Sequence, residues 1–135
     1  MRALFVLFVL APVVALAADT REIDFTQVLH TLDGKPMVWT CSTPVKQGEA
    51  CPEEAQVLAT LSDVAVTALE TTTDSDRSMD PMAKFKLDVI AHKIYKNAHA
   101  VLPVEDITTI KDRIGKVYGP AQIGAAWPLL DPSLK

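Results

Sequence analysis

The sequence predicts a mainly α fold of the α+β class, in which an N-terminal β-hairpin precedes a bundle of three to four short helices. Asp33-Gly34 separates two apolar runs within residues 22–40, which is a strong signal for a hairpin turn. Later segments place apolar residues three and four positions apart, as amphipathic helices do. Residues 18–135 have the length of one ordinary domain, so we expect a single small domain.

Residues 1–17 have the three parts of a secretory signal peptide. Arg2 precedes an apolar run, and small residues occupy the positions that a signal peptidase reads. A retained membrane anchor is the alternative, but the run contains Pro12 and is shorter than the ~20 apolar residues of a spanning helix. We therefore expect cleavage near Ala17/Ala18, no stable membrane anchor afterwards, and a secreted, periplasmic location.

The mature chain is mildly acidic. Removing Arg2 with the leader leaves 12 basic and 17 acidic residues, a net charge of −5. Proteins that bind DNA or RNA gain most of their affinity from basic residues gathered on one surface, and no such stripe stands out in this sequence. We expect no nucleic-acid partner.

The predicted hairpin over residues 22–40 is followed by a loop between Cys41 and Cys51. Pro36 lacks an amide proton, so it suits an edge strand of the hairpin. In an oxidising compartment the two cysteines are expected to form a disulfide that closes residues 41–51 into a ring. A zinc site or a redox pair fits less well, because these usually space their cysteines more closely.

Helices are predicted over residues 61–70, 81–98, 103–118 and 120–127. The first has two candidate starts: a long helix from Pro52, or a shorter helix capped at Thr60 that leaves residues 56–59 extended. The later starts are Asp80-Pro81, Pro103 and Gly119-Pro120, and Pro128 is expected to end the last helix.

Gly115-Lys116 does not mark a phosphate-binding loop. That motif reads G-x-x-x-x-G-K-[ST] after a strand, whereas Ile110 stands here in place of the first glycine and Val117 in place of Ser or Thr. We interpret Gly115 and Gly124 as positions of close helix packing.

Three segments carry a resemblance to a known family: "LPVEDITTIKDRIGKVYGPAQIGAAWPLLDP" at 102–132, "TLSDVAVTALE" and "IDFTQVLHTLDGKP". With D-G-K-P near the N-terminus and E-x-I-x-x-I-K-x-R-I-G-K-x-Y-x-P near the C-terminus, the chain resembles a family of small phage and prophage proteins of uncharacterised function. The resemblance covers most of residues 23–132 and implies neither an activity nor catalytic residues. The leader and the cysteine loop depart from the family pattern, and both suit an oxidising space.

Few residues suggest chemistry. Asp88 and His92 lie four positions apart on a predicted helix, where an exposed ion pair is the ordinary interpretation and part of a metal site the alternative. His99 lies two helical turns beyond His92, too far to share a metal with it. No serine stands in a G-x-S-x-G motif. We expect neither a catalytic group nor a cofactor.

Aromatic residues are the remaining candidates. They are Trp39, which lies beside the cysteine loop, Trp127 and Tyr118. These side chains either cap the core or contact a partner. The leading hypothesis is a secreted or periplasmic, non-enzymatic protein that binds another protein or an envelope component. The alternatives are a small hydrolase or metal-dependent protein that uses Asp88 and His92, and a cytosolic phage assembly factor with free thiols.

Overall fold

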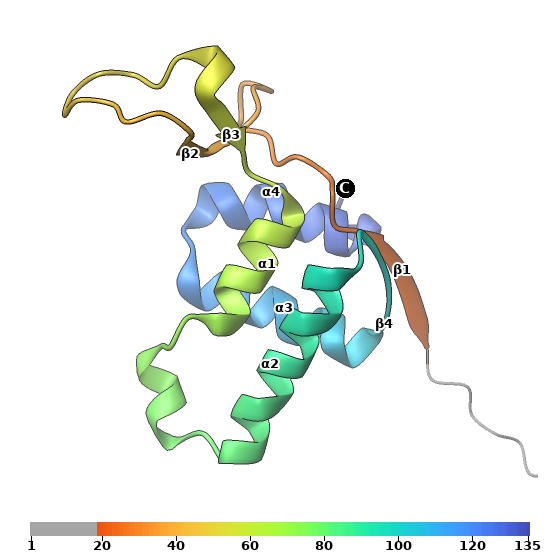
Figure 1. The fold of residues 1–135 in the computed structure, drawn as a ribbon. Helices are drawn as coiled ribbons and strands as arrows, with labels where there is room; N and C mark the ends of the chain where they lie inside the picture. The colour runs from red at the N-terminus through yellow and green to blue at the C-terminus, as the bar shows by residue number, and fades with distance from the viewer. Residues whose placement is uncertain (1–18) are drawn as a thin grey trace, which may run out of the picture.

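The computed structural model describes residues 19–135, so the predicted signal peptide 1–17 and its cleavage position lie outside the described residues. The mainly α, α+β fold class is confirmed, because four helices are accompanied by two two-stranded sheets, one of them a hairpin that precedes the first helix (Figure 1). The helices are α1 (Leu61–Glu70), α2 (Pro81–Lys96), α3 (Val104–Val117) and α4 (Pro120–Leu130). The strands are β1 (Thr20–Asp24), β2 (Val38–Cys41), β3 (Gln56–Leu58) and β4 (His99–Pro103). Three 3-10 turns complete the chain: η1 (Glu53–Ala55), η2 (Asp74–Ser78) and η3 (Pro132–Leu134).

Helix α1 lies at the centre of the helical body and contacts α2, α3 and α4 (Figure 1). Its buried face follows the helical spacing of its apolar residues, and apolar residues from both ends of the chain complete the core. The largest fully buried apolar side chains are Phe25, Leu29, Leu61, Val64, Ile90, Ile94, Leu102, Ile110, Ile114 and Leu130.

The shorter of the two predicted starts of α1 is the correct one. Thr60 and Asp63 form a reciprocal capping box: the Asp63 amide donates to the Thr60 hydroxyl over 3.2 Å, and the Thr60 amide donates to the Asp63 carboxylate over 2.9 Å. Residues 56–58 are extended and form β3. Pro52 precedes only a single 3-10 turn.

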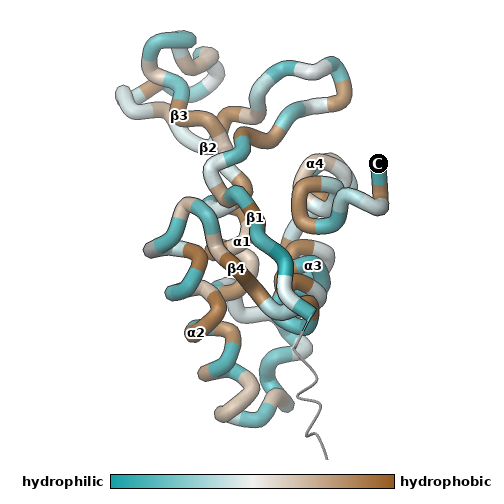
Figure 2. The backbone as a smooth tube through the Cα atoms, turned by 90° about the vertical axis from the view of Figure 1, so that its right-hand side faces the viewer, coloured by the Kyte–Doolittle hydropathy of each residue, from teal (hydrophilic) through white to brown (hydrophobic). Residues whose placement is uncertain are grey.

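The hairpin expected over 22–40 is wrong in its pairing. Strand β1 pairs antiparallel with β4, Ile23 opposite Ala100, whereas β2 pairs antiparallel with β3. Around the predicted turn a single bridge joins His30 to Pro36, and Gly34 takes the expected positive φ of 79°. Pairing with β4 covers Ile23 with the apolar inner face of that strand, which the Asp-Gly turn cannot supply. Figure 2 shows hydrophilic β1 beside hydrophobic β4.

Strand β4 was not expected, and it occupies the segment between the helices predicted over 81–98 and 103–118. Helix α2 ends at Lys96, and the Phe25 amide donates to the Ala98 carbonyl over 2.8 Å. Ala100 and Leu102 point inward while Val101 is exposed, which is the alternation of a half-buried strand. Three alternating positions before Pro103 are too short a pattern to be distinctive.

Pro128 does not end the last helix. Helix α4 runs to Leu130, and the Asp131 amide donates to the Trp127 carbonyl over 2.8 Å. Proline removes one amide donor from the helix, but the core packing of the fully buried Leu130 offsets that loss.

The two glycines interpreted as packing positions differ. A Cβ atom at Gly115 would lie 3.5 Å from the Trp127 ring, so α3 and α4 do meet closely there. A Cβ atom at Gly124 would meet no atom within 4 Å, so the packing expected at Gly124 is wrong. This glycine lines an open groove instead.

Candidate protein-binding surface

A disulfide-closed hairpin, here called the arm (residues 38–58), projects from the helical body beyond the start of α1 (Figure 1). The predicted disulfide is confirmed: Cys41 and Cys51 are bonded, with their Cα atoms 5.8 Å apart. Next to the disulfide, the Ser42 amide donates to the Ala55 carbonyl over 2.8 Å. The Gln56 side chain donates to the Cys51 carbonyl over 3.1 Å. The arm is therefore held by a covalent bond and by local hydrogen bonds, with little core of its own.

The arm exposes apolar side chains that a small domain would ordinarily bury. Val38 is 46% exposed, Val57 43%, Leu58 37% and Trp39 36%. Val38 and Leu58 are cross-strand partners, so their side chains stand together on one face. Leu32, on the turn below the arm, is fully exposed. Clustered apolar exposure of this kind marks interaction surfaces more often than isolated residues do.

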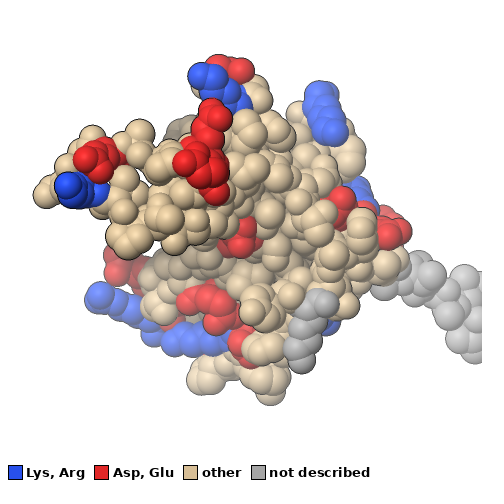
Figure 3. Space-filling model, turned by 45° about the horizontal axis from the view of Figure 1, so that its top comes forward, with Lys and Arg blue, Asp and Glu red and all other residues tan. Residues whose placement is uncertain are grey.

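The rim of the arm is acidic. Glu49, Glu53 and Glu54 are exposed against a single exposed lysine, Lys46. In the space-filling view, acidic and basic side chains stand among uncharged surface at this end of the molecule (Figure 3). The arm thus carries charged side chains beside its exposed apolar ones, a combination that many protein interfaces share.

A groove runs between the arm, the turn 31–35 and helix α4. One part, of about 510 Å³, is lined by Trp39, Met37, Tyr118 and Gln122 among others. The adjoining part, of about 890 Å³, lies between the turn and the small side chains of α4. The two parts share Thr31, Asp33 and Ala121 in their walls, so they are continuous.

Tyr118 forms part of the groove wall with a buried hydroxyl that has no hydrogen-bond partner among residues 19–135. Thr67 lies close to this hydroxyl, but no hydrogen bond of normal geometry forms between them. Burial raises the pKa of Tyr118 above its ordinary value, and the Asp63 carboxylate adds a smaller contribution in the same direction. The phenol therefore stays neutral.

The three aromatic candidates have different environments. Trp39 is exposed on the arm, whereas Trp127 and Tyr118 pack against the core. The Trp127 indole donates to the Lys111 carbonyl over 3.2 Å, and the Lys111 ammonium lies 5.3 Å from the ring centroid. The structure therefore places Trp39 and Tyr118 at the same groove and Trp127 between α3 and α4.

Asp88 and His92 form only an exposed pair. The His92 Nδ1 atom lies 3.2 Å from an Asp88 carboxylate oxygen, and both side chains are about half exposed or more. Glu70 lines the same shallow depression, yet over the described part of the chain no three such side chains come together as metal ligands would. His99 lies on β4 opposite Asp24, away from this pair.

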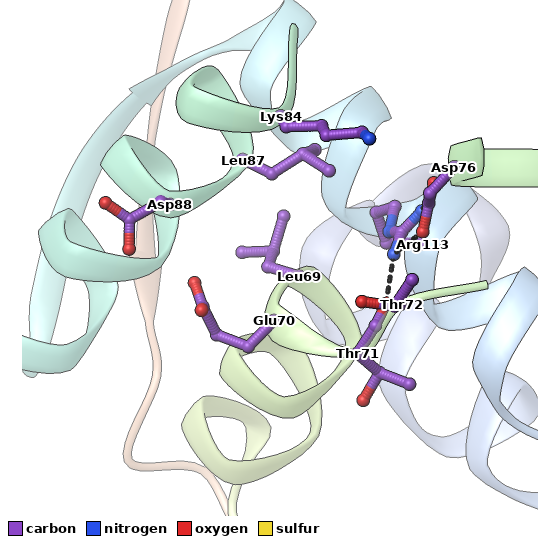
Figure 4. A pocket seen from close by; sticks show the side chains of 9 residues that line it. All are labelled: Leu69, Glu70, Thr71, Thr72, Asp76, Lys84, Leu87, Asp88 and Arg113. Atoms are coloured by element: carbon purple, nitrogen blue, oxygen red, sulfur yellow. Dashed lines mark hydrogen bonds and ion pairs between the residues drawn. The ribbon is translucent and has the colours of Figure 1, made fainter. Parts of the chain in front are cut away.

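A buried ion pair was not expected from the sequence. Arg113 on α3 is 1% exposed and makes a two-pronged contact with Asp76 of η2, with N–O distances of 2.7 and 3.0 Å (Figure 4). It also donates to the carbonyls of Ala68 and Thr71 at the end of α1. The guanidinium holds the pKa of Asp76 well below its usual range.

The depression beside this ion pair, of about 170 Å³, is the strongest alternative to the arm as a site (Figure 4). Lys84, Glu70 and Asp88 lie around it, and Arg113 forms its inner wall. The protein's own acceptors already engage the Arg113 guanidinium, so Arg113 is not free to bind a substrate anion. The sequence contains one indication that Arg113 is buried, because this residue lies three positions after Ile110, at the border of the apolar stripe of α3.

Comparison with known proteins gave no match to any protein-family model, to any curated protein or to any solved structure. The resemblance to small phage and prophage proteins therefore stays a prediction. Among the described helices, none combines the length and the hydrophobicity needed to cross a membrane.

Proposed function

We propose that the protein is an exported, non-enzymatic binding protein whose partner, another protein or an envelope component, docks on the arm and in the groove below it. The observation that carries this proposal is the cluster of exposed apolar side chains around Trp39 on a disulfide-held hairpin. A disulfide of this kind is typical of an oxidising compartment, which agrees with the predicted leader and argues against the cytosolic alternative.

The size of the apolar surface indicates that arm and groove act together. Full burial of a valine or leucine side chain is worth about 1.5–3 kcal/mol, so the four half-exposed residues of the arm would contribute about 4 kcal/mol in total. Association costs at least about 4 kcal/mol in lost freedom. The arm alone would therefore bind weakly, and a stable partner must also fill part of the groove.

A photoreactive phenylalanine analogue tests the proposal when it replaces Trp39, in cells that express the full chain. We expect a discrete adduct with one envelope or secreted protein. The same analogue in place of Tyr95, which is 77% exposed on α2, is the control for non-specific capture and should give no adduct. Equal labelling from both positions, or adducts with many proteins, would refute binding through the arm.

Export is tested separately by the intact mass of the protein recovered from the cells, before and after reduction and alkylation. We expect loss of residues 1–17 and two cysteines that react only after reduction. A full-length chain with two reactive thiols would support the cytosolic alternative.

A further inference from the structure

Helix α2 presents a second exposed surface, at the other end of the molecule from the arm (Figure 1). Met82 is 70% exposed and Phe85 61%. At 100° per residue these two side chains lie about 60° apart, and they point away from the side of α2 on which Ile90 and Ile94 are buried. We call the exposed face with Met82, Phe85, Lys86 and Lys93 the α2 face.

Residues 77–96, which contain α2, are basic although the chain as a whole is acidic. Residues 77–96 contain five basic and two acidic residues, a net charge of +3, against −4 for the whole chain. The other residues together therefore carry −7. Figure 2 shows hydrophobic and hydrophilic residues interleaved along α2.

Lys86 is the lysine of the α2 face that has no ion pair within residues 19–135, whereas Lys93 pairs with Asp106. Lys84 lies about 160° around the helix from Met82, where it lines the depression with Glu70 and Asp88. The Asp80 carboxylate caps the start of α2 by accepting from the Met82 and Ala83 amides over 2.9 and 3.3 Å. Its charge is thus directed toward the helix end, away from the lysine at position 86.

We propose that the α2 face binds the surface of an anionic lipid membrane. A helix that lies in the membrane interface places lysines at the headgroups and large apolar side chains among the upper acyl chains, and this face offers both. The charge selects anionic headgroups, because each lysine near such a surface contributes about 1 kcal/mol. A polyanion such as a nucleic acid fits less well, since it would leave Met82 and Phe85 in water.

The proposal is independent of the arm, since the two surfaces share no residue. The protein would lie on the membrane with α2 downward and hold the arm toward its partner (Figure 1). If no partner is captured, the proposed membrane binding is therefore unaffected. If the protein does not bind vesicles, the proposed binding of a partner through the arm is unaffected.

Vesicle co-sedimentation of the purified protein tests the proposal, with vesicles of phosphatidylglycerol and phosphatidylcholine compared with phosphatidylcholine alone. We expect binding to the anionic vesicles only, weakened by added salt. The Lys86→Glu variant should lose at least about fivefold in partition. The M82D/F85D variant should lose at least about tenfold. Acidic residues in the first turns of a helix favour its formation, so both variants should fold.

Matched controls carry the same changes elsewhere. Tyr95→Asp introduces an acidic residue at an equally exposed aromatic position of α2, outside this face. Lys46→Glu reverses one exposed lysine of the arm. Both controls should bind as the wild type does. Wild-type binding by M82D/F85D, equal losses in the controls, or retention on heparin without binding to vesicles would overturn the proposal. Every variant keeps the same N-terminus, so differences report on α2.

Discussion

At the scale of single residues, Arg113 is the buried charge on which three elements depend. Its guanidinium joins α3 to the end of α1 and to η2, and the protein engages it with one carboxylate and two backbone carbonyls. Buried arginines require this degree of compensation, because an unpaired buried charge is costly. The ion pair thus fixes the polar loop 71–80, which has few apolar residues of its own.

Removing one partner tests this role. Asp76→Asn keeps the shape but leaves the Arg113 charge buried without a counter-charge, which should lower the free energy of unfolding by about 3–5 kcal/mol. Asp112→Asn breaks an exposed pair with Lys116 and should cost no more than about 1 kcal/mol. Urea denaturation of both variants measures the difference, and equal small losses would contradict a structural role for the buried pair.

Asp131 makes the free energy of unfolding depend on pH in the acidic range. A hydrogen bond from the Ser133 hydroxyl, together with Lys111, lowers the pKa of Asp131 to about 2. The unfolded state therefore binds more protons as the pH falls below about 4, so stability is complete above that range and is lost toward pH 2. Denaturant unfolding across this range should show the decline, with a shallower slope in Asp131→Asn. An unchanged slope would contradict the assignment.

Of the residue-scale features, the sequence permits prediction of those that depend on near neighbours. The disulfide between Cys41 and Cys51 and the Asp88–His92 pair join residues ten and four positions apart. The Arg113–Asp76 pair joins residues 37 positions apart, and no periodicity connects them. The exposure of Trp39, against the partial burial of Trp127, depends on which elements pack together and is beyond any local pattern.

At the scale of elements, helices could be predicted and strand partners could not. The start of α1 at Leu61 and that of α2 at Pro81 follow from capping residues within three positions. Strand β1 instead finds its partner about 75 residues away, by matching apolar inner faces across the core. The Asp-Gly signal did form a turn, but a turn alone does not decide the partner of a strand.

The capping box of α1 should contribute measurably. Thr60→Ala removes the hydroxyl that accepts from the Asp63 amide and donates to the Asp63 carboxylate. The free energy of unfolding should therefore fall by about 1 kcal/mol. Thr108→Ala, which removes only an exposed hydroxyl bonded to the preceding turn of α3, is the matched control. Thermal unfolding of the two variants separates them, and equal midpoints would argue against the cap.

The disulfide should act on the arm and leave the helices unchanged. Replacing both cysteines by serine removes a ring whose closure is worth about 2.5–3 kcal/mol in the chain-entropy description. The arm has little apolar packing, so the loss should appear as faster amide hydrogen exchange within residues 38–58. Exchange in α1 and α3 should change little. Uniform loss of protection would contradict an arm that opens on its own.

At the scale of the whole molecule, a compact helical body carries two exposed surfaces at its two ends (Figure 1). The arm is apolar with an acidic rim, and the α2 face is apolar with a basic surround. The two ends therefore differ in charge, and our proposals assign anionic lipid to the α2 face and a partner to the arm.

The affinity of the captured partner for Trp39→Ala tests the central claim, binding through the arm, most directly. Central tryptophans of interfaces often contribute 2 kcal/mol or more, so this variant should bind at least about 30-fold more weakly than the wild type. Tyr95→Ala removes an equally large aromatic from α2 and should change the dissociation constant less than about threefold. Equal dissociation constants for the two variants would contradict the claim.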